Sequence, residues 1–334
     1  MAPVLTQREV VRRKLKSLYA PVAAELEQVE QLLRAELRNE HPCVDELAQH
    51  AFRLGGKRLR PALVLLTAQA CGNLQPDHIV LAAVVEMVHT ATLVHDDILD
   101  EATLRRHLET VNSRWGNKSS VLLGDYLFTH AFYLASTLSS TFACRKIGRA
   151  TNVVCEGELR QIHTQACFDL TEADYLSIID AKTAELCACC CALGAHYSGA
   201  NQAATAALEQ FGRNLGIAFQ IADDLLDVWG DEAQVGKSLG TDLEQQKPTL
   251  PLIRLLTELP GPERAAVVAA LKSPATQRRE FLAPYLARTD ALAYAHQKAA
   301  AFAALALQQL DCLPFSPAKL LLENLTEFVV TRRD

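Results

Sequence analysis

The sequence has 334 residues, a formal net charge of −6, 49% hydrophobic residues, 15 Gly and 13 Pro. This composition excludes a disordered or collagen-like chain, and the acidic balance gives the protein no general electrostatic reason to bind nucleic acid. Because nothing in the middle of the chain has the composition of a linker, we expect a single domain over residues 1–334.

Apolar residues recur at spacings of three and four in segment after segment, whereas alternating apolar and polar runs are almost absent. This pattern predicts an all-α fold. In chain order, the predicted helices span residues 8–38, 43–53, 60–71, 77–102, 118–139, 143–164, 172–199, 202–231, 249–258, 262–271, 287–310 and 316–331.

Neither the start of the chain nor its most apolar stretch carries a signal for export or membrane insertion. The first twenty residues are basic but contain no continuous apolar run followed by a cleavage site of small residues. The stretch 79–94 is shorter than a membrane span and is interrupted by Glu86 and His89. We therefore expect a buried helix there and a cytoplasmic protein.

An acidic cluster, Asp96-Asp97-Ile98-Leu99-Asp100, ends the predicted helix 77–102. Asp96 and Asp100 are four residues apart and so share a helix face, where like charges repel. Negative charge at a helix C-terminus is also opposed by the macrodipole. A bound cation would remove both costs, although a single cluster of this kind is also compatible with a solvated acidic helix end.

The predicted helix 172–199 contains four of the ten cysteines: Cys187, Cys189, Cys190 and Cys191. Neighbouring cysteines on a helix point in different directions, and no paired CxxC motif accompanies them, which disfavours a zinc site. We interpret these cysteines as small core residues rather than as disulfide partners.

A second cluster, Asp223-Asp224-Leu225-Leu226-Asp227, repeats the spacing of the first and again follows an apolar helical run. Two matching clusters favour one shared metal site. Hard oxygen ligands favour Mg²⁺ or Mn²⁺, and Mg²⁺ takes one or two carboxylates and fills its other positions with water and phosphate oxygens. Phosphate is therefore the expected third component.

Basic residues accompany the acidic clusters along the chain. Any one of them alone is compatible with an ordinary solvated side chain, and His89 alone is compatible with a core histidine. Their association with two acidic clusters predicts diphosphate binding, because ammonium and guanidinium groups bind phosphate oxygens. The candidates are Lys57, Arg60, His89, Arg105, Arg106, Lys182, Lys237 and Lys247.

Six motifs in this order resemble the trans-type isoprenyl diphosphate synthases, particularly the long-chain polyprenyl diphosphate synthases, over almost the whole chain. They are Gly-Gly-Lys-Arg-Leu-Arg-Pro (55–61), His-Thr-Ala-Thr-Leu-Val-His-Asp-Asp-Ile-Leu-Asp-Glu (89–101), Arg-Arg (105–106), Gly-Asp-Tyr-Leu-Phe (124–128), Lys-Thr-Ala (182–184) and Phe-Gln-Ile-Ala-Asp-Asp-Leu-Leu-Asp (219–227). The resemblance implies the isoprenoid synthase type I fold, an antiparallel helical bundle around a central cavity. The sequence departs from the family pattern at His107 and Gln246, where the family commonly has Gly. These two differences put in question the conformation of the loops that contain them.

The resemblance also implies residue roles. Asp96, Asp100 and Asp223 would bind Mg²⁺, three ions per active site with Mn²⁺ as an alternative, while Asp97, Asp224 and Asp227 complete the acidic walls. Arg105, Lys182 and Lys237 would assist at the allylic diphosphate, with Lys247 a further substrate-binding candidate. Isopentenyl diphosphate would be bound by Lys57, Arg60, His89 and Arg106. Gly56 would let the backbone approach that phosphate, and Thr183 and Gln220 would line the space where allylic charge develops.

Product length in this family depends on side-chain bulk below the first acidic cluster. Here those positions hold Ala91 and Thr92, with Val88 beyond, and no aromatic residue closes the tunnel. Ala91 lies five residues before Asp96, about 7.5 Å along the helix axis. This favours a long polyprenyl product and predicts that Ala91→Phe shortens it, unless the small residue only permits close helix packing.

Other functions remain to be weighed. A short-chain farnesyl or geranylgeranyl diphosphate synthase would share all of the chemistry, and a non-catalytic subunit of a heteromeric synthase would share the fold. A class I terpene cyclase would lack the Gly-Gly-Lys-Arg segment, and a head-to-head condensing enzyme would have other acidic motifs. The resemblance implies a homodimer, and the apolar product implies transient membrane contact.

Overall fold

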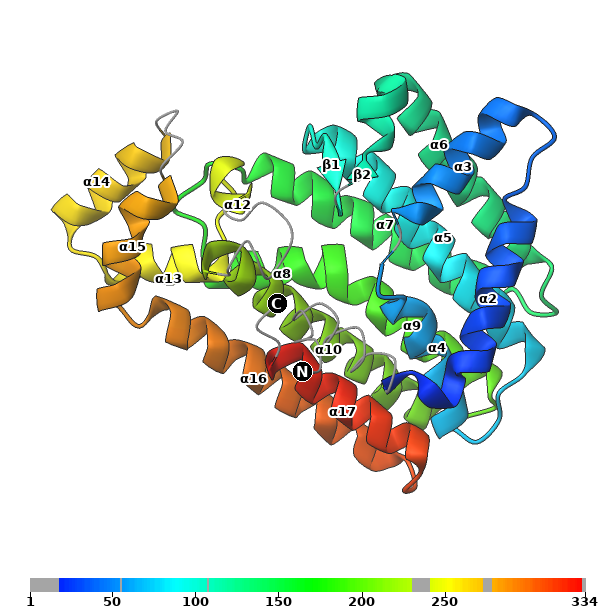
Figure 1. Ribbon diagram of the computed structural model, residues 1–334. Helices are drawn as coiled ribbons and strands as arrows, with labels where there is room; N and C mark the ends of the chain where they lie inside the picture. The colour runs from blue at the N-terminus through cyan, green and yellow to red at the C-terminus, as the bar shows by residue number, and fades with distance from the viewer. Residues whose placement is uncertain (1–17, 55, 107, 230–240, 273–277, 332–334) are drawn as a thin grey trace, which may run out of the picture.

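The computed structural model describes residues 18–54, 56–106, 108–229, 241–272 and 278–331. Helices account for nearly all of the regular structure in these residues, which confirms the prediction of an all-α fold (Figure 1). The helical elements are η1 (Ala20–Val22), α2 (Ala23–Glu36), α3 (Pro42–Arg53), α4 (Leu59–Ala70), α5 (Pro76–Leu99), α6 (Val111–Ser136), α7 (Phe142–His163), α8 (Glu172–Ile179), η2 (Asp180–Ala184), α9 (Glu185–Tyr197), α10 (Gln202–Trp229), α12 (Thr241–Glu244), α13 (Leu250–Glu258), α14 (Gly261–Lys272), α15 (Arg278–Arg288), α16 (Ala291–Gln309), η3 (Leu310–Cys312) and α17 (Pro317–Thr331).

Several helices begin at residues that satisfy their free backbone N–H groups. Pro76 occupies the first turn of α5, where a missing N–H costs nothing, and Gln75 and His78 form a capping box. Thr110 caps α6 by accepting from the Ser113 N–H, and Thr171 and Asp174 cap α8 reciprocally. The caps of α5 and α6 fix the starts of two helices that carry cavity residues.

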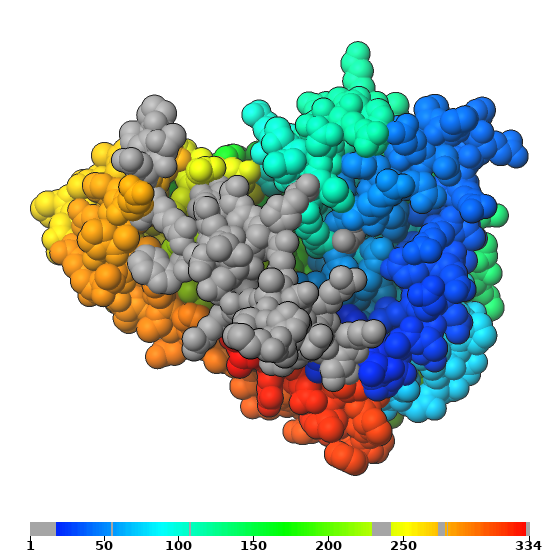
Figure 2. Space-filling view, in the orientation of Figure 1, coloured from blue at the N-terminus to red at the C-terminus, as the bar shows by residue number. Residues whose placement is uncertain are grey.

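The long helices α5 and α10 form the centre of the molecule. Helix α5 packs against α2, α4, α6 and α9, and α10 packs against α9, α16 and α17. Helices α13, α14 and α15 enclose a separate apolar cluster that includes Leu255, Val267 and Leu286. In the space-filling view, α14 and α15 form one end of the molecule, and α2 and α3 lie at the other end (Figure 2).

Helix α5 is apolar and long enough to cross a membrane, but 67% of its most apolar window is buried inside the protein. Leu81 to Val85 are all without solvent exposure. The buried helix predicted over 79–94 is thus confirmed.

Small residues allow α9 and α10 to pack at close range. A Cβ at Gly212 would lie 2.5 Å from the Cys187 carbonyl oxygen, and one at Gly216 would lie 2.6 Å from the Ala184 Cα. The four α9 cysteines are buried, and burial raises the pKa of each thiol. Their interpretation as small core residues is confirmed, and their thiols stay protonated.

The structure differs from the predicted elements in several places, and residues 8–17 of the predicted helix 8–38 lie outside the described residues. The helix predicted over 172–199 is interrupted at 180–184 by a π-helical turn. A two-stranded hairpin, β1 (Leu104–Arg105) and β2 (Leu108–Glu109), follows the first acidic cluster. Helix α15 was missed because Pro284 lies inside it, and internal proline normally argues against a helix.

Candidate active site

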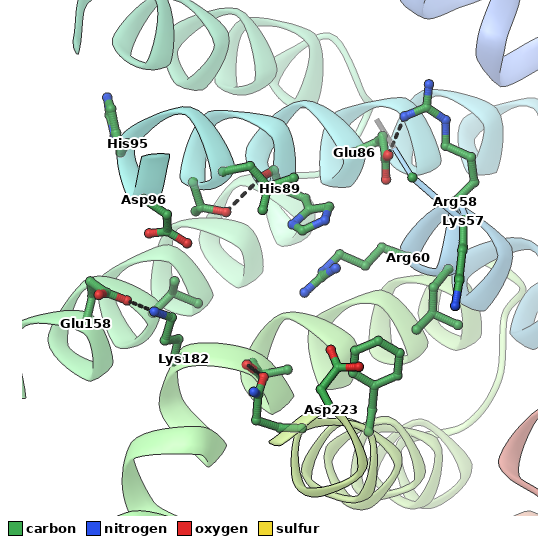
Figure 3. A pocket seen from close by; sticks show the side chains of 18 of the residues that line it. Lys57, Arg58, Arg60, Glu86, His89, His95, Asp96, Glu158, Lys182 and Asp223 are labelled. Carbon is green, nitrogen blue, oxygen red and sulfur yellow. Dashed lines mark hydrogen bonds and ion pairs between the residues drawn. The ribbon is translucent and has the colours of Figure 1, made fainter. Parts of the chain in front are cut away.

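A cavity of about 580 Å³ lies among the loop before α4 and helices α5, α7, α10 and α17. Its wall joins charged groups to a large apolar surface (Figure 3). The acidic residues of the wall are Glu86, Asp96, Glu158 and Asp223. The basic ones are Lys57, Arg58, Arg60, His89, His95, Arg105, Arg106 and Lys182. The larger apolar residues are Leu93, Leu99, Phe128, Val154, Leu159, Ile162, Phe219, Leu325, Phe328 and Val329.

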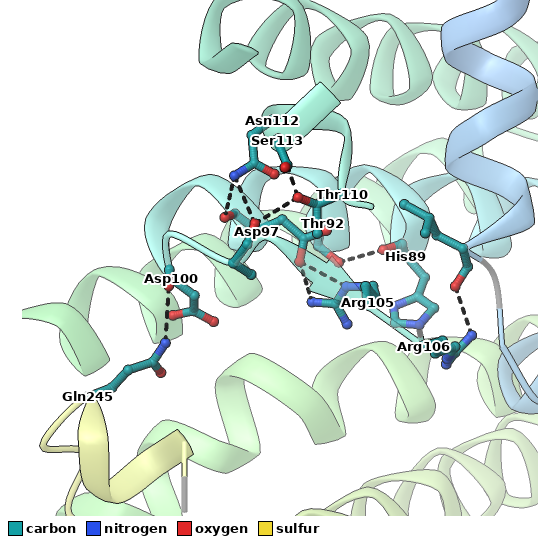
Figure 4. Close-up of polar contacts among 12 residues, drawn as sticks. His89, Thr92, Asp97, Asp100, Arg105, Arg106, Thr110, Asn112, Ser113 and Gln245 are labelled. Carbon is teal, nitrogen blue, oxygen red and sulfur yellow. Dashed lines mark hydrogen bonds and ion pairs between the residues drawn. The ribbon is translucent and has the colours of Figure 1, made fainter. Parts of the chain in front are cut away.

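Only one carboxylate of the first acidic cluster lines this cavity. Asp96 does so, whereas Asp97 Oδ1 accepts hydrogen bonds from Arg105 Nε at 2.9 Å and Nη2 at 2.8 Å (Figure 4). The sequence had assigned Asp97 to the acidic wall. Consecutive helix residues point about 100° apart, so Asp97 cannot share the direction of Asp96 and instead positions the cationic Arg105.

The surroundings of Asp96 disfavour its charged form. Burial raises its pKa to about 6, and Glu158 and Asp100 act in the same direction, while Lys182 and Arg105 oppose them. A divalent cation beside this carboxylate would stabilise its charged form and reverse the shift.

Asp100 lies at the edge of the cavity, in a neighbouring polar pocket. Lys247 Nζ donates a 3.0 Å hydrogen bond to Asp100 Oδ1, and Gln245 Nε2 donates to the Asp100 backbone carbonyl at 3.3 Å. The structure therefore brings Lys247 to the first acidic cluster, as the substrate-binding assignment requires. Lys237 lies outside the described residues.

The second acidic cluster divides in the same way as the first. Asp223 lines the cavity. Asp224 is buried behind it and accepts hydrogen bonds from Tyr175 at 2.6 Å and from Gln220 Nε2 at 2.8 Å. Asp227 is also buried and accepts from the Asp242 backbone N–H at 3.0 Å. Asp224 and Asp227 thus depart from their assignment to the acidic wall, because their carboxylates satisfy interior donors.

Among the described residues, no three His, Cys, Asp or Glu side chains form a ready-made metal cage. Asp96 and Asp223, from different helices, nevertheless line one cavity. This donor set fits Mg²⁺, which takes one or two protein carboxylates and completes its octahedron with water and substrate phosphate oxygens.

The π-helical turn at 180–184 carries Lys182 and Thr183 to the cavity wall. Such turns shift a helix by one residue and are frequent at functional sites. Lys182 forms an ion pair with Glu158, and the Thr183 hydroxyl donates to Gln220 Oε1 at 2.8 Å. Gly157 makes room for this turn, because a Cβ there would lie 2.7 Å from the Lys182 backbone nitrogen.

Of the predicted isopentenyl diphosphate residues, Lys57, Arg60 and His89 lie on the side of the cavity away from Glu158 (Figure 3), and Arg106 also lines the cavity. Arg60 Nε is buried and, within the described part of the chain, has no hydrogen-bond partner. His89 is desolvated and surrounded by positive charge: burial, then Arg60, Arg106 and other arginines, lower its pKa well below the ordinary value. His89 is therefore neutral at pH 7, and this arginine-rich wall requires an anion.

Gly56 is needed for the position of Arg106. A Cβ at Gly56 would lie 2.1 Å from Arg106 Nη2, and Arg106 Nη1 donates to the Leu54 carbonyl at 2.9 Å. The role of Gly56 is thus steric, since it admits the guanidinium beside the loop. His107 lies outside the described residues.

Gln246, the second departure from the family pattern, has a φ of 55°. This left-handed conformation explains why glycine suits the position, since other residues adopt it at a cost. Gln246 Nε2 donates to the Leu271 carbonyl at 3.0 Å, and its own carbonyl accepts from the Ala166 N–H at 3.0 Å. These bonds hold the loop despite the unfavourable backbone.

Sequence reasoning missed an ion-pair cluster around Arg58. Arg58 has a φ of 51°, and its guanidinium donates to Glu86 at 2.5 Å and to both carboxylate oxygens of Glu30. Arg58 occupies the N-cap position of α4, the helix that carries Arg60, and it comes directly after Lys57. Its ion pairs therefore fix the backbone between the two cavity cations Lys57 and Arg60. The signal was Glu86, a charged residue inside an otherwise apolar helix.

The proposed chain-length residues do not lie together. Thr92 lines the cavity. Ala91 and Val88 are buried in the core and are not among the residues that line the cavity. The helix turns by about 100° per residue, which places Ala91 on the packing face and Thr92 on the cavity face.

Comparisons with known proteins agree with this geometry. Residues 41–284 match the family model "Polyprenyl synthetase". The chain is 36% identical to an all-trans-nonaprenyl-diphosphate synthase (geranyl-diphosphate specific) of Rhodobacter capsulatus, covering 95% of this chain and 98% of the relative. It is 34% identical to a geranylgeranyl diphosphate synthase of Saccharolobus solfataricus, covering 87% of this chain and 90% of the relative.

The fold comparison gives the same result. A crystal structure of a polyprenyl synthase from Caulobacter crescentus, complexed with calcium and isoprenyl diphosphate, matches with a TM-score of 0.90 and 35% identity over 96% of this chain and 98% of that one. A family match over most of the chain, together with a cavity that joins paired acidic helices to an arginine-rich wall, shows that the chain belongs to the polyprenyl synthetase family of trans-prenyltransferases.

Proposed function

We propose that the protein condenses isopentenyl diphosphate head-to-tail with an allylic diphosphate and repeats the step to make a long trans-polyprenyl diphosphate. The main observation behind this proposal is that one cavity is lined by the carboxylates of Asp96 and Asp223, by the arginine-rich wall around Arg60 and by an extended apolar surface. The two carboxylates match a metal-bound allylic diphosphate, the arginine-rich wall matches the diphosphate of isopentenyl diphosphate, and the apolar surface matches a growing hydrocarbon chain.

The allylic diphosphate binds between the two acidic helices in this proposal, with Asp96, Asp100 and Asp223 holding Mg²⁺, in up to three ions, or Mn²⁺ in its place. When bound, the metal would neutralise negative charge on the departing diphosphate. Lys182, Arg105, Lys247 and Lys237 supply further positive charge to that leaving group. The raised pKa of Asp96 and the pairing of Lys182 with Glu158 support a site that is completed by its ligands.

Isopentenyl diphosphate binds to Lys57, Arg60, His89 and Arg106 in this scheme. Arg60 Nε lacks a partner among the described residues, and His89 is desolvated beside several arginines. A diphosphate would satisfy the guanidinium and neutralise the excess positive charge, which supports this assignment.

The reaction breaks the allylic C–O bond, and the diphosphate leaves with the bonding electrons. The double bond of isopentenyl diphosphate then attacks the allylic carbon, and loss of a proton gives a diphosphate longer by five carbons. Thr183 and Gln220 line the cavity next to Lys182 and present oxygen atoms that stabilise the positive charge. The apolar wall excludes water, which would otherwise capture the cation.

A long product is favoured over a short one because several helices contribute apolar residues to the cavity wall, among them Leu93, Phe128 and Val154. Leu159 and Ile162 are exposed, at 67% and 45%, and Ile162 also lines the polar pocket around Asp100, so the cavity opens to solvent at the acidic end. The relatives include a nonaprenyl and a geranylgeranyl synthase, so the short-chain alternative is decided by sizing the product.

We further propose that the protein is a cytoplasmic homodimer with transient membrane contact during product release. Helix α6 supports a dimer because it exposes Val121, Leu122 and Tyr133 at 45%, 69% and 62%. Light scattering of the purified protein tests the dimer by measuring its molar mass in solution. The exposed Leu99, Leu159 and Ile162 beside the cavity support membrane contact, which flotation with phospholipid vesicles tests in the presence and absence of product.

The decisive experiment incubates the purified protein with Mg²⁺, labelled isopentenyl diphosphate and farnesyl or geranylgeranyl diphosphate, followed by sizing of the dephosphorylated products. Chains of about six or more isoprene units support a long-chain synthase, and chains of three or four units support the short-chain alternative. No incorporation by the protein alone, with incorporation after a partner protein is added, would identify a subunit of a heteromeric synthase. EDTA should abolish incorporation, and Mg²⁺ or Mn²⁺ should restore it.

A further inference from the structure

A chain of hydrogen bonds leads from the cavity to a tyrosine that does not line it. Thr183 Oγ1 donates to Gln220 Oε1 at 2.8 Å, Gln220 Nε2 donates to Asp224 Oδ1 at 2.8 Å, and the hydroxyl of Tyr175 donates to Asp224 Oδ2 at 2.6 Å. The chain joins the π-helical turn, α10 and α8. Thr183 and Gln220 line the cavity, whereas Asp224 and Tyr175 are buried behind it.

Each bond in this chain fixes the direction of the next. Burial raises the pKa of Asp224, whereas the hydrogen bonds from Tyr175 and Gln220 lower it and so favour the ionised form. The ionised carboxylate only accepts hydrogen bonds, so Asp224 holds the amide nitrogen of Gln220 on its own side. The amide oxygen must then face Thr183 and accepts its hydroxyl hydrogen. With that hydrogen engaged, the remaining lone pairs of Thr183 and Gln220 are the groups available to a positive charge in the cavity.

Asp224 needs a second donor to remain in this orientation. Its carboxylate is 4% exposed, and burial of an ionised group is costly unless strong donors satisfy it. Tyr175 supplies that donor from α8 and is itself 4% exposed. Without the tyrosine hydroxyl, Asp224 Oδ2 loses the hydrogen bond from Tyr175, and the carboxylate can rotate together with the Gln220 amide.

We propose that Tyr175 is a positioning residue of the reaction: through Asp224 it fixes the Gln220 amide and the Thr183 hydroxyl so that oxygen lone pairs, rather than N–H or O–H groups, face the developing allylic cation. This inference rests on the proposed function for the chemistry of the cavity. It adds a residue from α8, a helix that has no side chain in the cavity wall.

The chain offers a matched control in Tyr294. Its hydroxyl also donates a 2.6 Å hydrogen bond to a carboxylate, that of Glu172 on α8, but neither residue lines the cavity. Tyr175→Phe and Tyr294→Phe therefore remove the same group from bonds of the same length. Only the first bond leads to Gln220.

Steady-state kinetics with Mg²⁺, isopentenyl diphosphate and geranylgeranyl diphosphate would separate positioning from general destabilisation. Tyr175→Phe should lower kcat by about tenfold to a hundredfold, the usual effect of misplacing a reacting group. KM for isopentenyl diphosphate should stay within about twofold, because Arg60 and His89 do not contact this chain of bonds. Tyr294→Phe should leave kcat unchanged. A fall in kcat no larger than that of Tyr294→Phe would overturn the proposal.

A double-mutant comparison tests the route. If Tyr175 acts through Gln220, the Tyr175→Phe change should have no further effect on kcat in the Gln220→Ala background. Effects that multiply would show that Tyr175 acts independently, which contradicts the proposal.

A third readout does not depend on activity. In a neutron crystal structure of Tyr175→Phe, which distinguishes the amide nitrogen from the oxygen, the 2.8 Å bond between Thr183 and Gln220 should be lost or reversed, whereas Tyr294→Phe should retain it. An unchanged bond in Tyr175→Phe would refute the positioning role. Failure of the proposed function has a different signature, since the unmodified protein and Tyr294→Phe would then both incorporate no isopentenyl diphosphate.

Discussion

Asp97 and Arg105 form a two-bond ion pair in which the carboxylate is 2% exposed and the guanidinium 26% exposed. The pair lies beside the cavity carboxylate Asp96 but serves a different purpose, since it orients a cavity cation. Two adjacent aspartates of one motif should therefore respond to substitution in opposite ways.

Asp97→Asn should destabilise the protein by about 1 to 3 kcal/mol: burial raises the pKa of Asp97, but the substitution removes both contacts of Oδ1 with Arg105 and leaves that guanidinium without its counter-ion. Asp96→Asn should not destabilise the ligand-free protein, since it removes a carboxylate whose charged form is disfavoured. Chemical denaturation at pH 7.5 in EDTA measures both effects. Equal losses of stability would contradict the separation of roles within the motif.

The pH dependence of stability follows from the pKa of Asp96. Because its pKa in the folded protein is about 6, above the unfolded value, the folded state binds the proton more tightly. The contribution of Asp96 to stability is therefore largest at low pH and is lost as pH rises from about 4 to about 6. In EDTA, the stability difference between Asp96→Asn and the unmodified protein should grow over this window and then level off. A constant difference from pH 4 to 8 would exclude the shift.

The sequence was sufficient for the class of fold and for most helix boundaries, because apolar spacing of three and four is a local signal. Helix α10, predicted as 202–231, is observed as Gln202–Trp229, and α5, predicted as 77–102, is Pro76–Leu99. The π-helical turn at 180–184 was not predictable, since it depends on the close approach of Gly157. The family resemblance also assigned Asp97 and Asp224 to the cavity wall, because it does not show their partners: Arg105 in the following hairpin and Tyr175 on α8.

The Arg58 cluster should control the affinity for isopentenyl diphosphate rather than the rate of the chemical step. The planar guanidinium of Arg58 contacts Glu30 and Glu86 at the same time. In Arg58→Lys a single ammonium group takes its place, so the loop that carries Lys57 and the start of α4 should lose its fixed position. We expect KM for isopentenyl diphosphate to rise about tenfold while kcat changes by less than about threefold.

Arg254 provides the control for Arg58, because it contacts both oxygens of Asp290 at 2.7 Å and does not line the cavity. Arg254→Lys should leave KM for isopentenyl diphosphate unchanged. If kcat rather than KM falls in Arg58→Lys, the cluster acts on the chemical step and the interpretation is wrong.

Product length gives a sharp test of which helix face borders the hydrocarbon chain. Thr92 lines the cavity and its hydroxyl donates to the His89 carbonyl at 2.7 Å, whereas the neighbouring Ala91 is fully buried. Thr92→Phe should project a ring into the cavity and shorten the product. Ala91→Phe should overpack the core, costing about 1 to 3 kcal/mol of stability, with less effect on product length. Sizing the dephosphorylated products of both variants, alongside thermal unfolding, distinguishes the two faces. A shorter product from Ala91→Phe alone would place the growing chain on the Ala91 side and restore the tunnel position inferred from the sequence.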